Sequence, residues 1–300
     1  MKTDLRALAG LTLMACMSSA MAEEGGWLPT LDVEAGMGHD SNVTRGLYER
    51  DIVDDTLATA SLAAAWNHEF GAMSAATLRA FAEAEQFSDV DTLNRTTFGV
   101  QGMYRWQNAL GFTVPFYQIS ATLLQDDAET RFREAERAVT QAFMTRRITD
   151  AFRLSLGVEA SVQEAKGKVF DLEQARVFAN GDLQLNESWA TYGTYSLIKG
   201  DTVSSAQQQF CNGALAADTY ELIVSADELE PDTALNEALC GSWLAYRLPA
   251  LTHVFVLGVN RGFGHHLSFD ASVQHVLVFA EEGGHEYQRT IARAGILARF

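Results

Sequence analysis

The feature that most constrains the fold is the last stretch of the sequence, residues 287–300, which alternates with a period of two. Its three arginines, Arg289, Arg293 and Arg299, all fall on odd positions, whereas the even positions carry no charge. Successive side chains of a β-strand point to opposite faces of the sheet. The pattern therefore predicts a strand with one cationic face and one uncharged face.

The chain stops on an aromatic residue, Phe300. An alternating final strand that ends in Phe resembles the C-terminal strand of Gram-negative outer-membrane β-barrels. The resemblance implies that Phe300 is the assembly signal read by the barrel-assembly machinery, and that the chain lies in the outer membrane.

The N-terminus predicts an export signal over residues 1–22. Lys2 and Arg6 form a weakly basic start, a short apolar core follows, and residues 20–22 read Ala-Met-Ala, a typical cleavage site. The apolar core is too short to span a membrane as a helix. Residues 13–16 also vaguely resemble a lipobox ending at Cys16, so a lipoprotein is the alternative.

The charge balance excludes one class of partner. The formal net charge is −17, and removing the signal peptide makes it −18. A chain this acidic is not a nucleic-acid binder. Beyond Cys16 the chain has two cysteines, Cys211 and Cys240, and an even pair in an exported protein predicts a disulfide.

Alternation recurs along the whole of residues 23–300, which we interpret as one all-β domain. The pattern predicts about twelve antiparallel strands of a single transmembrane β-barrel, at residues 27–38, 56–67, 75–87, 96–106, 112–124, 137–147, 152–163, 177–185, 189–199, 243–259, 269–279 and 287–300. An even number of strands suits single-chain barrels, in which short turns are periplasmic and long loops extracellular. Fourteen strands would require one more, at residues 219–225, together with a split of residues 243–259.

Aromatic residues support this sidedness. They lie at the strand ends predicted to be periplasmic, where an aromatic girdle is expected: Trp27, Trp66, Trp106, Phe112, Phe152 and Trp189.

Two segments leave alternatives open. Residues 75–86 are rich in Ala, Leu and Glu and could be helical by propensity. The longest connection, at about 200–241, is predicted to be an acidic extracellular loop, and residues 232–246 could hold a helix. Its carboxylates could bridge lipopolysaccharide phosphates through divalent cations, although their spacing matches no calcium loop and a solvated charge cluster is the simpler interpretation.

The polar faces of the strands favour a membrane barrel over a secreted sandwich or a lipocalin. An arginine on the lipid-facing side costs about 2–4 kcal/mol at the bilayer midplane, so we expect the charged faces to point into the lumen. They carry seven arginines and seven carboxylates: Arg79, Arg105, Arg153, Arg176, Arg289, Arg293 and Arg299 with Asp32, Glu34, Glu83, Glu85, Glu159, Asp182 and Asp270. Balanced charges in a narrow bore should pair.

Residues 36–45 read Gly-Met-Gly-His-Asp-Ser-Asn-Val-Thr-Arg. This run resembles a G-x-G-[YH]-[DS]-x-N-V motif near the first strand of many outer-membrane barrels without an assigned activity. The resemblance implies the architecture and nothing catalytic.

No enzymatic motif is found, because the sequence lacks G-x-S-x-G, a P-loop, H-E-x-x-H and C-x-x-C. His265 and His266 are adjacent and would point to opposite faces of a strand, which makes them a poor metal pair. His39 and Asp40 could suggest a protease, but no second pair completes a site. We expect no cofactor and no metal.

Two functions remain from different classes. The first is a narrow porin-like channel for small solutes, with weak selectivity. The second is a non-conducting barrel with a structural, assembly or surface-interaction role. The expected partners are outer-membrane lipid, lipopolysaccharide and the barrel-assembly machinery.

Overall fold

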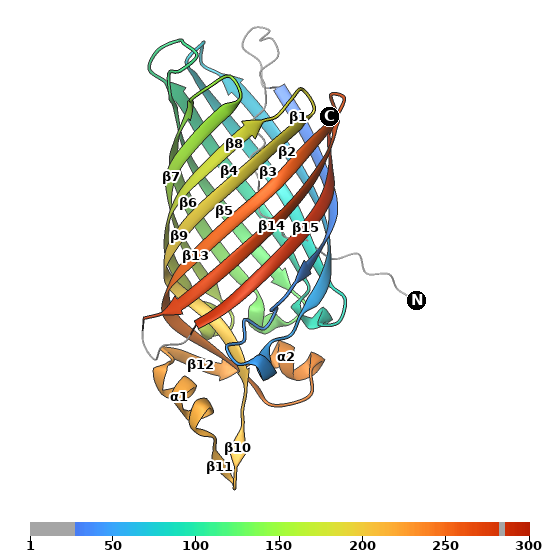
Figure 1. Ribbon diagram of the computed structural model, residues 1–300, viewed down its shortest axis with the longest axis vertical. Coiled ribbons are helices and arrows are strands. Elements are labelled where there is room, and N and C mark those ends of the chain that lie inside the picture. The colour runs from blue at the N-terminus through green and yellow to red at the C-terminus, as the bar shows by residue number, and fades with distance from the viewer. Residues whose placement is uncertain (1–27, 282–285) are drawn as a thin grey trace.

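Twelve strands close into one antiparallel barrel in the computed structural model, which describes residues 28–281 and 286–300 (Figure 1). The predicted signal peptide and Trp27 lie outside these residues. The barrel strands are β1 (Leu28–Asp40), β2 (Asp55–Glu69), β3 (Ser74–Phe87), β4 (Arg95–Gln107), β5 (Phe116–Ala128), β6 (Ala135–Arg147), β7 (Phe152–Ala165), β8 (Leu172–Gln184), β9 (Trp189–Gln207), β13 (Trp243–Phe263), β14 (Leu267–Ala280) and β15 (Glu286–Arg299).

Each strand pairs with its sequence neighbour, and β1 pairs with β15 to close the sheet. Closure satisfies the ladder hydrogen bonds that an open edge would leave unpaired. The predicted count of twelve is therefore confirmed. Residues 75–86 form part of strand β3, because pairing with β2 and β4 overrides their helical propensity.

Short turns lie at the end marked C in Figure 1, which we call the periplasmic end. The opposite, extracellular end carries four 3-10 helices in its loops: η1 (Glu49–Asp51), η2 (Asp91–Leu93), η3 (Arg131–Arg133) and η4 (Lys168–Phe170). The longest connection joins β9 to β13 and holds β10 (Phe210–Cys211), β11 (Ala214–Leu215), α1 (Ala217–Ser225), β12 (Glu228–Pro231) and α2 (Thr233–Ala238).

The expected loop at 200–241 is shorter and more structured than its sequence suggests. Strand β9 runs on to Gln207 because Trp243–Arg247 of β13 pairs with it well beyond the last pairing of β14. There β12 takes the place of β14 beside β13. The segment proposed as an extra strand, 219–225, is helix α1, whereas the helix expected within 232–246 is present as α2.

The outer surface of the barrel is apolar. Large side chains exposed there alternate with inward polar ones, among them Leu78, Phe98, Val100, Ile119, Leu123, Leu156, Val158, Val177, Leu257 and Val273. On the described barrel strands, charged side chains of the outer parity lie towards the strand ends, except Lys199 and Asp201 of β9, which are level with the extracellular end of the neighbouring strand β8. This distribution is what a lipid-facing band requires.

Aromatic rings collect near the periplasmic end of the outer surface, as expected for an interfacial girdle. Trp106 stacks between Tyr104 and Tyr117, with ring centroids 5.7 and 5.6 Å apart. Arg261 lies over the rings of Trp189 and Phe263. These amphipathic side chains mark one boundary of the apolar band.

Candidate functional site

Ion pairs connect neighbouring strands along the inner wall of the barrel. Arg176 of β8 lies 3.4 Å from Glu159 of β7, and Glu159 also accepts a hydrogen bond from Gln141 of β6 at 3.0 Å. Next to these strands, Arg137 of β6 lies 3.6 Å from Asp126 of β5. The inner face is thus a connected polar lining.

The same lining continues across the closure between β15 and β1. Arg299 donates to Asp32, and Arg289 donates to Asp40 from its Nε at 2.8 Å. Glu85 of β3, only 5% exposed, lies 3.1 Å from both Arg95 of β4 and Arg293 of β15. Because Glu85 is nearly buried, its two arginines provide the compensation that a desolvated carboxylate needs.

All fourteen residues expected to face the lumen lie on one face of the sheet, as the strand register shows. Their individual environments differ. Arg79 stacks on Phe81 at 4.6 Å and Arg105 on Phe116 at 5.6 Å. Arg153 is opposite Asp182, which accepts a hydrogen bond from Asn180.

Four partners in this lining were not anticipated: Asp40, Arg95, Asp126 and Arg137. Each belongs to a strand end that sequence alternation placed in or beside a loop. Thr97, for example, donates to Asp126, and both are buried. Continuing the alternation by one or two residues beyond the predicted strands would have found Asp40, Arg95 and Asp126, whereas Arg137 is the first residue of a predicted strand and has its inward parity.

Two aromatic rings on the inner wall pack over glycines of the neighbouring strands. A Cβ atom added to Gly157 would overlap the rings of Phe178 and the Cβ of Phe143, and one added to Gly99 would overlap Phe81. Inward glycines thus leave shallow recesses in the wall into which these rings pack.

Loops gather at the extracellular end, and we call them the cap: residues 41–54, η2, η3, η4 and residues 208–242. In Figure 1, α1 and the β10–β11 hairpin project from the cap away from the barrel. The loop 41–54 reaches from β1 to β9, where the amide of Ser205 donates to Thr44 O at 3.0 Å. Val43 and Leu235 of the cap form a buried apolar cluster with Val90, which precedes η2, and Trp243 of β13. This packing fixes loops that are distant in sequence.

Asp232 is the polar centre of the cap and is fully buried. It accepts hydrogen bonds from Arg133 at 2.7 Å and from Ser205 at 2.8 Å, and it caps α2 by accepting from the Leu235 amide at 3.2 Å. Burial lowers the pKa of Arg133, and the Asp232 carboxylate opposes that shift. The pair ties η3, β9 and α2 together.

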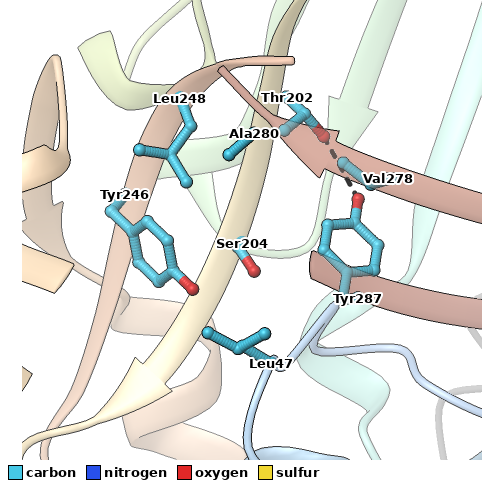
Figure 2. Close-up of a pocket in the computed structure, with 8 residues that line it drawn as sticks. All are labelled: Leu47, Thr202, Ser204, Tyr246, Leu248, Val278, Ala280 and Tyr287. Atoms are coloured by element: carbon cyan, nitrogen blue, oxygen red, sulfur yellow. Dashed lines mark hydrogen bonds between the residues drawn. The ribbon is translucent and has the colours of Figure 1, made fainter. Parts of the chain in front are cut away.

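A small apolar pocket remains where loop 41–54 meets the inner wall (Figure 2). Leu47 approaches Tyr246 and Leu248 of β13, and the hydroxyls of Tyr287 and Thr202 hydrogen-bond at 3.1 Å. Its free space is that of about one water molecule. The pocket is a packing gap under the loop and cannot hold a solute.

The expected disulfide is absent from the structure. Cys211 and Cys240 are both free and exposed. Cys211 belongs to the β10–β11 hairpin, which projects from the cap, whereas Cys240 follows α2 on the covering segment (Figure 1). Their even number did not determine their separation, because pairing requires the two Cα atoms to lie within about 7 Å.

Phe300 lies at the periplasmic end with an exposed ring. Its amide and carbonyl exchange hydrogen bonds with Leu31 at 2.9 Å, and its ring stacks on His266. The terminal residue is therefore paired through its backbone while its side chain stays accessible.

The described residues hold no group of three or more His, Cys, Asp or Glu that could bind a metal ion. Among those residues, no helix has the length and hydropathy to cross a membrane.

Comparisons with known proteins bear on the fold. No protein-family model matches the chain, and no curated protein matches its sequence. Among solved structures, the chain is similar to an outer-membrane channel from Pseudomonas putida F1, with a TM-score of 0.51 and 11% identity over 93% of this chain and 97% of that chain. It is also similar to an anion-selective porin from Comamonas acidovorans, with a TM-score of 0.41 and 8% identity over 92% and 100% of the two chains. The chain has the fold of Gram-negative outer-membrane β-barrels.

Proposed function

We propose that this protein is a narrow outer-membrane channel for small solutes. The observation that carries the proposal is the polar, ion-paired lining of the inner wall inside an apolar outer surface. A barrel without a solute path would gain more by filling its interior with apolar side chains, because buried charge pairs add little stability. Twelve strands give a bore between filled eight-stranded barrels and open sixteen-stranded porins.

The lining supports low conductance with weak selectivity. Its charges are largely matched, so neither ion sign dominates the wall, and its long side chains narrow the bore. Arg105 and Arg153 are inward arginines near the periplasmic ends of β4 and β7. Under this proposal, their long side chains narrow the passage at that end.

Recording single channels in planar lipid bilayers tests the proposal. Arg105→Ala and Arg153→Ala should each raise the conductance, since each removes a long inward side chain. Arg146→Ala is the matched control, because Arg146 is exposed and has the outward parity on β6. Absence of any current from folded wild-type protein, or a large pore with strong ion preference, would contradict the proposal.

The second candidate is a non-conducting barrel with a structural or surface role. The cap favours it, because the covering loops pack through buried clusters at the extracellular end. Under this alternative, removing the cap's central ion pair would leave the protein silent in a bilayer.

We propose no catalytic activity, since the sequence contains none of the nucleophile, phosphate-binding or metal-ligand motifs of enzymes. The proposed partners are outer-membrane lipid, lipopolysaccharide and the barrel-assembly machinery. The apolar outer band supports the first, and the accessible ring of Phe300 supports the last.

A further inference from the structure

The longest connection carries an exposed apolar tip, by which we mean Phe210 and Leu215 of the β10–β11 hairpin together with Tyr220 and Val224 of α1. Phe210 and Leu215 are 61% and 38% exposed, and Tyr220 and Val224 are 61% and 64% exposed. The hairpin and α1 project from the cap, away from the lipid-facing band of the barrel (Figure 1). Large apolar side chains gathered on one projecting unit are typical of a surface that binds another molecule.

The hairpin holds its two apolar side chains in place. Phe210 and Leu215 are directly opposite each other in the pairing of β10 with β11, so both side chains leave the same face. The connecting turn is Asn212-Gly213, with φ values of +52° and +82°. Both residues occupy the left-handed region that a type I′ hairpin turn requires, and Asn-Gly is the sequence that suits this turn best. The apolar pair is therefore displayed on a preformed turn.

Helix α1 is anchored by one face and exposes the other. Thr219 and Leu222 are buried, and Leu222 belongs to the same apolar cluster as Tyr246 of β13. Residues four positions apart are neighbours on a helix surface, so the exposed Tyr220 and Val224 lie together on the outer side of α1. The helix is thus fixed to the barrel without using this second apolar pair.

Hydrogen bonds join the hairpin to the helix. The Ala216 amide donates to Gln209 O at 2.9 Å, and the Gln209 amide donates to the Thr219 hydroxyl at 3.1 Å. The two apolar pairs therefore belong to one unit, whose backbone is ordered before any partner arrives. Such preorganisation lowers the entropy that is lost on binding.

The charge of this segment has one sign. Residues 208–242 contain seven carboxylates and no lysine, arginine or histidine. Two of the carboxylates are compensated within the protein, since Asp218 pairs with Arg50 and Asp232 pairs with Arg133. The carboxylates that are exposed are those of Glu221, Asp227 and Glu237. Negative charge therefore borders the apolar tip.

This charge selects among the molecules that could meet an extracellular surface. Nucleic acids and the phosphates of lipopolysaccharide are anionic, and a second copy of this chain would bring its own carboxylates to the contact. Like charges across an interface disfavour all three. A cationic partner is attracted instead, and aromatic rings such as those of Phe210 and Tyr220 bind lysine and arginine side chains over their faces.

We propose that the apolar tip is the docking surface for a cationic segment of another protein, in which lysine or arginine accompanies apolar side chains. The apolar side chains of the partner would cover the hairpin pair, Tyr220 and Val224, and its cations would face Glu221 and Asp227. The inference goes beyond the proposed channel function and does not depend on it, because the tip lies outside the barrel.

Peptide binding to the full chain in phosphatidylcholine nanodiscs tests this surface. Fluorescence anisotropy follows a labelled short peptide in which lysine alternates with leucine and tryptophan, and empty nanodiscs give the background. Wild type should bind this peptide, and the affinity should fall as salt is added. A peptide with glutamate in place of lysine, and one with serine in place of leucine and tryptophan, should each bind about tenfold more weakly or not at all.

A double variant assigns the binding to the tip. Tyr220→Ser combined with Val224→Ser should weaken binding of the lysine peptide by about tenfold, because both side chains lose the apolar contact that the peptide would bury. Leu110→Ser is the matched control, since Leu110 is 68% exposed in the connection between β4 and β5 at the opposite end. It should bind like wild type. Heat-modifiable migration on gels shows that each variant is folded.

Several results would overturn the proposal. Equal affinity of the double variant and wild type would do so, as would equal weakening by Leu110→Ser or equal binding of the glutamate peptide. Analytical ultracentrifugation could show wild-type dimers that the double variant loses, which would assign the tip to a second copy of the chain. Binding to lipopolysaccharide vesicles that the double variant loses would assign the tip to lipid.

Discussion

At the residue scale, the cap depends on a single buried carboxylate. Asp232 is the shared acceptor for Arg133, Ser205 and the Leu235 amide. Asp232→Ala leaves Arg133 without its carboxylate, and breaking a buried pair in this way costs about 3 kcal/mol. Because these contacts join the cap to β9, the loss should be local to residues 208–242 and leave the barrel folded.

Limited proteolysis measures this effect. The Asp232→Ala protein should be cleaved within 208–242 under conditions that leave wild type intact. Under the proposed channel function, bilayer recordings of the same variant should show more frequent or larger openings than wild type. Asp227→Ala is the control, since Asp227 is exposed in the same segment. Equal protease resistance of the two variants would show that the apolar clusters hold the cap without the ion pair.

At the scale of the element, β15 does two separable things. Its inward arginines pair with β1 and β3, and Phe300, the residue that follows it, pairs with Leu31 through the backbone. Deleting Phe300 removes two hydrogen bonds at a strand end, so the folded barrel should lose about 1–3 kcal/mol at most. Assembly should suffer far more if the ring is the signal that its resemblance implies.

Cell fractionation distinguishes these effects. The deletion variant should accumulate unfolded in the periplasm, whereas the fraction that reaches the membrane should unfold much as wild type does. Phe300→Tyr, which keeps an aromatic ring, is the matched control. An unchanged membrane yield for the deletion would rule out the C-terminal signal.

At the scale of the whole molecule, closure determines stability. In the closed sheet, β1 pairs with β2 and β15, so no barrel strand presents a free edge along its full length. Unfolding in detergent requires many ladder bonds to break together. Unboiled protein should therefore migrate apart from boiled protein on a denaturing gel, with a β-type circular dichroism spectrum that is lost on boiling. A helical spectrum, or a single mobility before and after boiling, would contradict this expectation.

The sequence by itself determined the strands and the inner face of the barrel, because a period of two is a local property that each strand displays alone. Arg289, Arg293 and Arg299 all lie on odd positions, so they share one face of the strand whatever its neighbours are. Because an arginine that faces lipid is costly, that face must point into the lumen. The count of twelve strands followed from the same local alternation and from the turns between the alternating segments.

Only the tertiary structure decided which residues from distant strands and loops contact each other. Glu85 meets Arg293 only because β15 closes against β1, and Arg45 reaches β9 only because its loop folds inward across the mouth. The cap is likewise beyond sequence reasoning, since α1, α2 and Asp232 are positioned by contacts over more than 25 residues of separation. Cys211 and Cys240 are free in the structure. The sequence shows only that there are two cysteines, whereas a disulfide also depends on the distance between them in the fold.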